Sequence, residues 1–191
     1  MLDVMYFLIG VIVLLFIIAF VFLSRDVFRT GMIKVHRVKI KDKESFWVSA
    51  LFLVIFLVIA VWEFVKFRPA TNYLSYIGIV LIFIGGLIRI YAKKELDRFF
   101  SFEVLIQKGH KLVTKGIYKY IMHPMYTGFA LELIGLALAL RSRYSLLVLI
   151  IIGTPVLLYR INAEEKLLIK EFGKDYLQYM ERTKKLIPKV F

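Results

Sequence analysis

Three long apolar runs occupy the first half of the chain, at Val4–Leu23, Phe46–Phe64 and Tyr73–Tyr91. The first run holds twenty residues and no charged side chain. Because a helix rises about 1.5 Å per residue, a run of this length crosses the roughly 30 Å hydrocarbon core of a bilayer. Asp3 precedes the first run and no small-residue cleavage site follows it, which favours an uncleaved span over a signal peptide. We therefore predict three membrane-spanning helices within residues 1–91.

Two shorter apolar runs, Phe129–Leu140 and Leu146–Tyr159, lie further along and are separated by Arg141–Arg143. Together they predict a helical hairpin that crosses the membrane and returns. Pro124 precedes the first of them, and proline is well tolerated at the first position of a helix. Glu132 lies inside this hairpin, and a carboxylate at such a depth is expected to face protein rather than lipid.

The segments on either side of the hairpin are too polar for the membrane interior. Residues 92–122 form a polar loop, and residues 163–182 keep the rhythm of an amphipathic helix that bends at Gly173. The predicted fold class is all-α: a polytopic membrane protein with about five transmembrane helices, the last two a helical hairpin, plus a C-terminal cytoplasmic amphipathic helix. We treat residues 1–191 as a single integral membrane domain.

Small and charged residues within the third run predict how this helix packs and where its arginine side chain points. Gly78, Gly85 and Gly86 are typical of helices that pack closely in membranes. Arg89 lies near the end of the same run, and we expect its long side chain to snorkel toward the lipid headgroups.

Composition agrees with a membrane protein, and the distribution of basic residues predicts how the chain is oriented in the membrane. Hydrophobic residues make up 60% of the 191 residues, against about half in soluble domains. The net charge is +13, and the first, third and final connectors hold 7, 7 and 8 basic residues, whereas the second and fourth hold 2 each. The positive-inside rule therefore predicts an external N-terminus with the polar loop and C-terminus in the cytoplasm. This pattern explains the positive charge without a nucleic-acid partner.

The residues most suited to binding or catalysis lie in two stretches, His110–Tyr126 and Arg160–Tyr179. The predicted topology places both stretches on the same side of the membrane. Neither contains a Gly-x-Gly-x-x-Gly motif or a phosphate loop, which argues against a Rossmann or kinase site. The chain has no cysteine, so a thiolate metal site and a cysteine nucleophile are excluded. The histidines of the two stretches, His110 and His123, lie 13 residues apart without an i, i+4 pair, and we predict no metal site.

Two adjacent glutamates add negative charge to the second stretch. On a helix Glu164 and Glu165 point about 100° apart, so only one of them faces a given ligand directly. Arg160 lies one turn before Glu164, where an i, i+4 pair can orient both side chains.

The order of these residues resembles the isoprenylcysteine carboxyl methyltransferase family, which belongs to a wider group with the phospholipid methyltransferases. The resemblance covers about two fifths of the chain, from Gly109 to Pro188. Small prokaryotic members are as similar to it as eukaryotic ones. The residues that carry it are His110-Lys111-Leu112-Val113, Gly116, Tyr118, His123-Pro124-Met125-Tyr126, Arg160, Glu164-Glu165, Phe172-Gly173, Tyr176, Tyr179 and Pro188.

The resemblance implies a methyltransferase that uses S-adenosyl-L-methionine, with residues 92–191 as its cofactor-binding and catalytic part. The donor would be enclosed on the cytoplasmic side by the polar loop and the C-terminal helix. It also implies Arg160 and Glu165 as catalytic residues, with Arg160 toward the acceptor. The implied cofactor-binding residues are His110, Lys111, Leu112, Val113, Tyr118, His123, Pro124, Met125, Tyr126 and Glu164.

The residue types suit this chemistry. Carboxylates and aromatic faces stabilise the sulfonium and ammonium of the donor. Methyl transfer is an in-line displacement that gains rate from orientation and exclusion of water, so no covalent nucleophile is needed.

One position departs from the family pattern, since Met122 stands where the family usually has an arginine before the His-Pro pair. The implied acceptor is lipophilic or amphipathic, either an isoprenylcysteine carboxylate or a lipid amine, with membrane lipid as the other partner. Two alternatives stay open: an NADPH-dependent membrane reductase of the sterol reductase type, and a non-enzymatic membrane protein with a degenerate site. The oligomeric state is not predicted.

Overall fold

The computed structural model describes residues 41–42, 44–67, 69–100, 104–105, 109 and 111–187. The chain divides into two compact units, Met1–His36 and Arg37–Phe191, and all of the described residues belong to the second. The predicted span at Val4–Leu23 and the candidate residue His110 lie outside the described residues.

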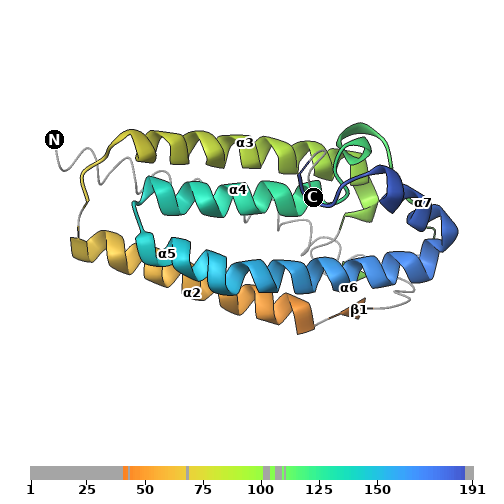
Figure 1. Ribbon diagram of the computed structural model, residues 1–191, viewed down its shortest axis with the longest axis horizontal. Helices are drawn as coiled ribbons and strands as arrows, with labels where there is room; N and C mark the ends of the chain where they lie inside the picture. Colours follow the sequence, from red (N-terminus) through yellow and green to blue (C-terminus); the bar gives the residue numbers. More distant parts are fainter. Residues whose placement is uncertain are drawn as a thin grey trace. The chain divides into compact units, whose positions relative to one another are not determined.

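The described part is helical apart from one short strand pair (Figure 1). In that pair, β1 (Lys41–Asp42) runs antiparallel to β2 (Val104–Leu105). Three further short elements are the 3-10 turns η1 (Asp97–Phe99) and η2 (Gly116–Lys119) and the π-helical turn η3 (Leu149–Gly153). The α-helices are α2 (Glu44–Phe67), α3 (Tyr73–Leu96), α4 (Pro124–Ala139), α5 (Arg143–Val148), α6 (Thr154–Phe172) and α7 (Lys174–Arg182).

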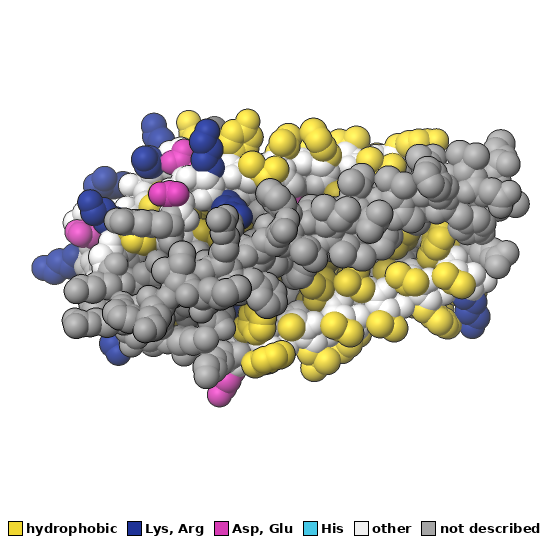
Figure 2. All heavy atoms as spheres, turned by 180° about the vertical axis from the view of Figure 1, so that it is seen from behind, with side chains coloured by type: hydrophobic (Ala, Val, Ile, Leu, Met, Phe, Trp, Pro, Cys, Tyr) yellow, Lys and Arg dark blue, Asp and Glu magenta, His cyan; other side chains and the backbone are white. Residues whose placement is uncertain are grey.

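Three of the described helices are long and apolar enough to cross a membrane: α2, α3 and the continuous helix Arg143–Phe172 formed by α5, η3 and α6. A shorter apolar helix, α4, precedes the last of these. The helical structure predicted for Phe46–Phe64 and Tyr73–Tyr91 is confirmed, as is the turn at Arg141–Arg143. In Figure 2, apolar side chains line the upper and lower edges of the described part, while most of the visible Lys and Arg side chains gather at its left end.

Helices α3 and α4 pack closely along their length because facing glycines let the backbones approach (Figure 1). Gly78 faces Gly135, and Gly85 faces Gly128. In each pair, a Cβ added to either glycine would lie closer than 3.0 Å to the backbone of the other helix. The close packing predicted from the glycines of the third run is therefore confirmed for Gly78 and Gly85.

The space beside one glycine pair holds a buried ion pair. Arg89 Nη1 donates a hydrogen bond to Glu132 Oε2, and the two residues are only 2% and 3% exposed. The Arg89 guanidinium also lies 5.5 Å from the centroid of the Phe129 ring. The expectation that Arg89 snorkels to the headgroups is wrong, because a carboxylate on the neighbouring helix satisfies it within the bundle. The prediction that Glu132 faces protein is confirmed.

On the other side of the bundle, α2 packs against α5 and α6. The buried Glu63 carboxylate near the end of α2 accepts hydrogen bonds from the backbone N–H groups of Arg143 and Tyr144 at 3.1 and 3.0 Å. It also accepts one from Ser142 Oγ at 2.6 Å. Glu63 thus satisfies the otherwise free N–H groups at the start of α5 and fixes the turn between α4 and α5.

Candidate active site

A short C-terminal segment closes one end of the bundle. Residues 183–187, called here the strap, follow α7 and run parallel to the residues just before α4. Pro124 fixes where α4 begins, and Gly173 fixes where α6 ends and α7 begins. The two segments that meet in this contact are therefore positioned by a proline and a glycine close to them in sequence. The hydrogen bonds that hold the strap join Met122 N to Lys184 O (2.8 Å), His123 N to Lys185 O (3.0 Å) and Thr127 Oγ1 to Leu186 O (2.8 Å).

The strap brings a lysine to a buried carboxylate. Glu165 Oε2 accepts a hydrogen bond from Lys185 Nζ at 2.7 Å, and Glu165 Oε1 lies 3.2 Å from His123 Nε2. His123 is 4% exposed and Glu165 is 6% exposed. Burial alone would raise the pKa of Glu165, but the hydrogen bonds from His123 and Lys185 outweigh it and hold this pKa below its usual value.

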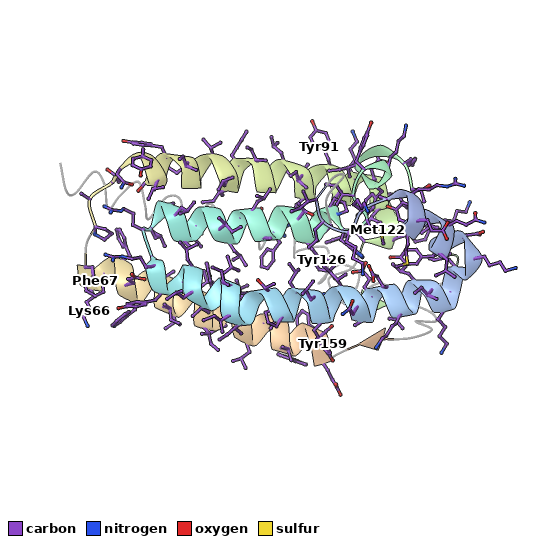
Figure 3. All side chains as sticks on the ribbon, in the orientation of Figure 1. Lys66, Phe67, Tyr91, Met122, Tyr126 and Tyr159 are labelled. Carbon is purple, nitrogen blue, oxygen red and sulfur yellow. The ribbon has the colours of Figure 1, made fainter. Side chains whose placement is uncertain are left out.

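A second cluster lies alongside, between α4 and α6. Tyr126 OH donates a hydrogen bond to Glu164 Oε2 at 2.6 Å and accepts one from Arg160 Nε at 3.2 Å. Figure 3 shows Tyr126 in the space between α4 and α6 and Met122 close to α7. One tyrosine hydroxyl therefore links a carboxylate and a guanidinium that lie one turn apart on α6.

An aromatic cluster packs against these charged groups. Met122, Tyr176 and Tyr179 are buried together, and Tyr179 OH donates a hydrogen bond to Tyr118 O at 2.5 Å. Burial raises the pKa of Tyr118, Tyr176 and Tyr179, with the negative charge of Glu164 contributing for the first two. All three hydroxyls therefore stay protonated at neutral pH.

The structure places the predicted site residues in three groups. His123, Tyr126, Arg160, Glu164 and Glu165 come together in the two hydrogen-bonded clusters. Leu112 packs on the aromatic cluster beside Met122. The other predicted residues lie within residues 111–125, close in sequence to Met122 and His123. Lys111 is exposed, Val113 and Met125 are half-buried, and Tyr118 and Pro124 are buried.

Sequence reasoning missed Lys185 and Thr127. Lys185 follows another lysine in a polar tail, a pattern typical of a solvated segment, and only the parallel contact with residues 121–123 brings it to Glu165. Within the described part of the chain, no group of three or more His, Cys, Asp and Glu residues is arranged to hold a metal ion.

Replacing Lys185 by methionine is expected to lower the free energy of unfolding by about 1–2 kcal/mol, since the buried Glu165 carboxylate loses its ammonium donor. Thermal unfolding in detergent measures the change. Lys184→Met is the matched control: it removes the same charge from an exposed side chain whose residue contributes only its backbone oxygen to the strap contact. Equal losses in the two variants would show that the Lys185–Glu165 contact contributes nothing specific.

Several known proteins are similar to this chain. A model of the isoprenylcysteine carboxyl methyltransferase (ICMT) family matches residues 77–170. The probable protein-S-isoprenylcysteine O-methyltransferase of Oryza sativa subsp. indica is 30% identical over 118 residues, which cover 61% of this chain and 62% of the rice protein. The protein-S-isoprenylcysteine O-methyltransferase of Saccharomyces cerevisiae is 32% identical over 125 residues, covering 64% of this chain and 52% of the yeast protein.

The solved structure of the eukaryotic intramembrane Ras methyltransferase ICMT matches with a TM-score of 0.61 and 26% identity, over 74% of this chain and 52% of that protein. The chain therefore spans between about half and three fifths of the length of these relatives. The apolar helices and these matches define an integral membrane protein of the α-helical class. Over residues 77–170 the chain is similar to the isoprenylcysteine carboxyl methyltransferase family, and its named relatives are members of that class.

Proposed function

We propose that this protein is a membrane-embedded methyltransferase that uses S-adenosyl-L-methionine and methylates a lipophilic or amphipathic acceptor. The observation that carries the proposal is the Glu164–Tyr126–Arg160 cluster, in which a carboxylate and a guanidinium are held beside one tyrosine hydroxyl, within the residues that match the family model. The names of the rice and yeast relatives support an isoprenylcysteine carboxylate as acceptor, and a lipid amine is the other acceptor class.

The residues of the site fit this donor. It carries a sulfonium, an ammonium and ribose hydroxyls, which match a carboxylate, aromatic rings and a buried hydroxyl. When bound, it supplies a methyl group activated by the positively charged sulfur. The Glu164 carboxylate, oriented by Tyr126, would accept hydrogen bonds from it. Residues 111–113 and Tyr118 would line the adenosyl side of the pocket.

Arg160 is suited to hold an anionic acceptor, because its guanidinium lies beside the Tyr126 ring, 5.9 Å from the ring centroid. This role would compensate for Met122, which is buried in the aromatic cluster and offers no charge. Both oxygens of Glu165 are engaged by His123 and Lys185. We therefore propose that Glu165 positions the start of α4, and that most of the rate comes from alignment of two bound partners and exclusion of water.

The proposed topology has five spans, an external N-terminus, and a cytoplasmic polar loop and C-terminus. The helix Arg143–Phe172 has 30 residues, or about 45 Å, so its last turns extend beyond a roughly 30 Å hydrocarbon core. Those turns carry Glu164 and Glu165 and the exposed Lys166 and Lys170. The positive-inside rule supports a cytoplasmic site, where soluble S-adenosyl-L-methionine is available.

Calorimetric titration of the detergent-solubilised protein tests the proposal. We expect saturable binding of S-adenosyl-L-methionine and of its demethylated product, S-adenosylhomocysteine, and no binding of NADPH in a parallel titration. Binding of NADPH alone would replace the proposal with a reductase. Binding of neither compound, in a sample with a cooperative melting transition, would indicate a non-enzymatic protein with a degenerate site.

A further inference from the structure

Among the described residues, one tyrosine of the aromatic cluster has a hydroxyl group for which no hydrogen-bond partner is found. Tyr176 on α7 is 1% exposed, and its hydroxyl makes no hydrogen bond within the described residues. The neighbouring tyrosines differ, because Tyr179 OH donates to Tyr118 O and Tyr126 OH donates to Glu164. Buried polar groups are nearly always paired, and an unpaired one in a candidate site indicates a missing partner.

The surroundings of Tyr176 limit what this partner can be. Its ring packs against Tyr179, with the ring centroids 6.0 Å apart, and against Met122 in the buried cluster. Besides burial, the negative charges of Glu165 and Glu164 raise the pKa of Tyr176, so its oxygen lies in the field of two carboxylates. A hydrogen-bond donor with a positive charge is the group that such a position favours.

We propose that the Tyr176 hydroxyl is a ligand contact, whose oxygen accepts a hydrogen bond from the primary ammonium of the bound methyl donor. The inference rests on the proposed function and deepens it, since it assigns the amino-acid end of the donor to α7. S-adenosylhomocysteine carries the same ammonium, whereas 5′-methylthioadenosine lacks the amino-acid end altogether. The two compounds therefore separate contacts to the ammonium end from contacts to the adenosyl group.

Tyr176→Phe removes this hydroxyl and keeps the ring that packs in the cluster. We expect its affinity for S-adenosylhomocysteine to fall about tenfold, the effect of losing one hydrogen bond to a charged group. Its affinity for 5′-methylthioadenosine is expected to equal that of the wild type. Without ligand, its melting temperature is expected to be equal or higher, because an unpaired polar group has been removed.

Tyr179→Phe is the matched control, three residues along the same helix. Its hydroxyl has a partner in the ligand-free protein, the backbone oxygen of Tyr118. We expect this variant to melt at a lower temperature while keeping the wild-type ratio of affinities for the two compounds. The two substitutions remove the same group, so they distinguish a ligand contact from a structural hydrogen bond.

Three results would overturn the inference while the wild type still binds S-adenosylhomocysteine, which leaves the proposed function in place. Unchanged affinity of Tyr176→Phe would show that the hydroxyl is no ligand contact. Equal losses for both compounds would place the contact away from the ammonium. A lower melting temperature without ligand would show that the hydroxyl already has a partner. If the wild type binds neither compound, the proposed function and the inference fall together.

Discussion

Glu132→Leu is expected to lower the free energy of unfolding by about 3–5 kcal/mol, because it leaves the Arg89 guanidinium buried without its carboxylate. The two residues are almost fully buried between α3 and α4, on helices held close by facing glycines. Arg89 cannot move to the headgroups without opening that packing. Denaturant-induced unfolding in detergent micelles, followed by circular dichroism, measures the loss.

The double variant Arg89→Leu/Glu132→Leu is the control for this prediction. Replacing a buried ion pair by apolar residues of similar size is often nearly neutral, so the double variant should recover most of the stability lost in either single variant. Losses that add in the double variant would show that the two side chains do not stabilise each other. Since neither residue belongs to the two site clusters, all three variants that stay folded should bind S-adenosylhomocysteine as the wild type does.

This ion pair also shows where sequence reasoning stops. The pattern of apolar residues correctly predicted the helix that carries Arg89, and the glycine spacing correctly predicted close packing. The direction of the Arg89 side chain depends on a partner 43 residues away on α4. A period of apolar residues reports which face of a helix is buried, but it contains no information about which helix lies against that face.

Helix ends were more predictable, because they depend on neighbouring residues. Pro124 starts α4, the Arg141–Arg143 turn separates α4 from α5, and Gly173 adopts a φ of +54° between α6 and α7. The first and last of these follow from local backbone chemistry, namely the missing N–H of proline and the positive φ open to glycine, whereas the turn was predicted from the polar residues that interrupt the apolar pattern. By contrast, the partnership of Glu165 with Lys185 depends on how the strap returns across the bundle.

The adjacent glutamates illustrate the same limit within the site. The 100° separation on a helix predicted that they would face different groups. In the structure Glu164 contacts Tyr126 and Glu165 contacts His123, three residues earlier and just before α4. Helical geometry was therefore sufficient to separate them, whereas only the packing of α4 on α6 shows which partner each of them receives.

Glu164→Gln is expected to weaken binding of S-adenosylhomocysteine by about 1.5–3 kcal/mol, roughly 10- to 100-fold, because a neutral amide replaces a charged acceptor. Glutamine keeps the length of the side chain and an oxygen that can accept the Tyr126 hydroxyl, so the fold should lose little stability. Calorimetric titration measures the affinity. Glu181→Gln, at an exposed position on α7, is the control for the loss of one negative charge and should bind as the wild type does.

Glu165→Gln should behave in the opposite way, and this contrast decides the roles of the two carboxylates. Its charge interacts with Lys185 and His123, so neutralising it should loosen the strap and lower the melting temperature. If Glu164→Gln binds normally while Glu165→Gln loses affinity without losing stability, the assignment is reversed and Glu165 is the carboxylate that contacts the donor. If both variants lose stability and neither loses affinity, both carboxylates belong to the scaffold and the donor is held by other residues.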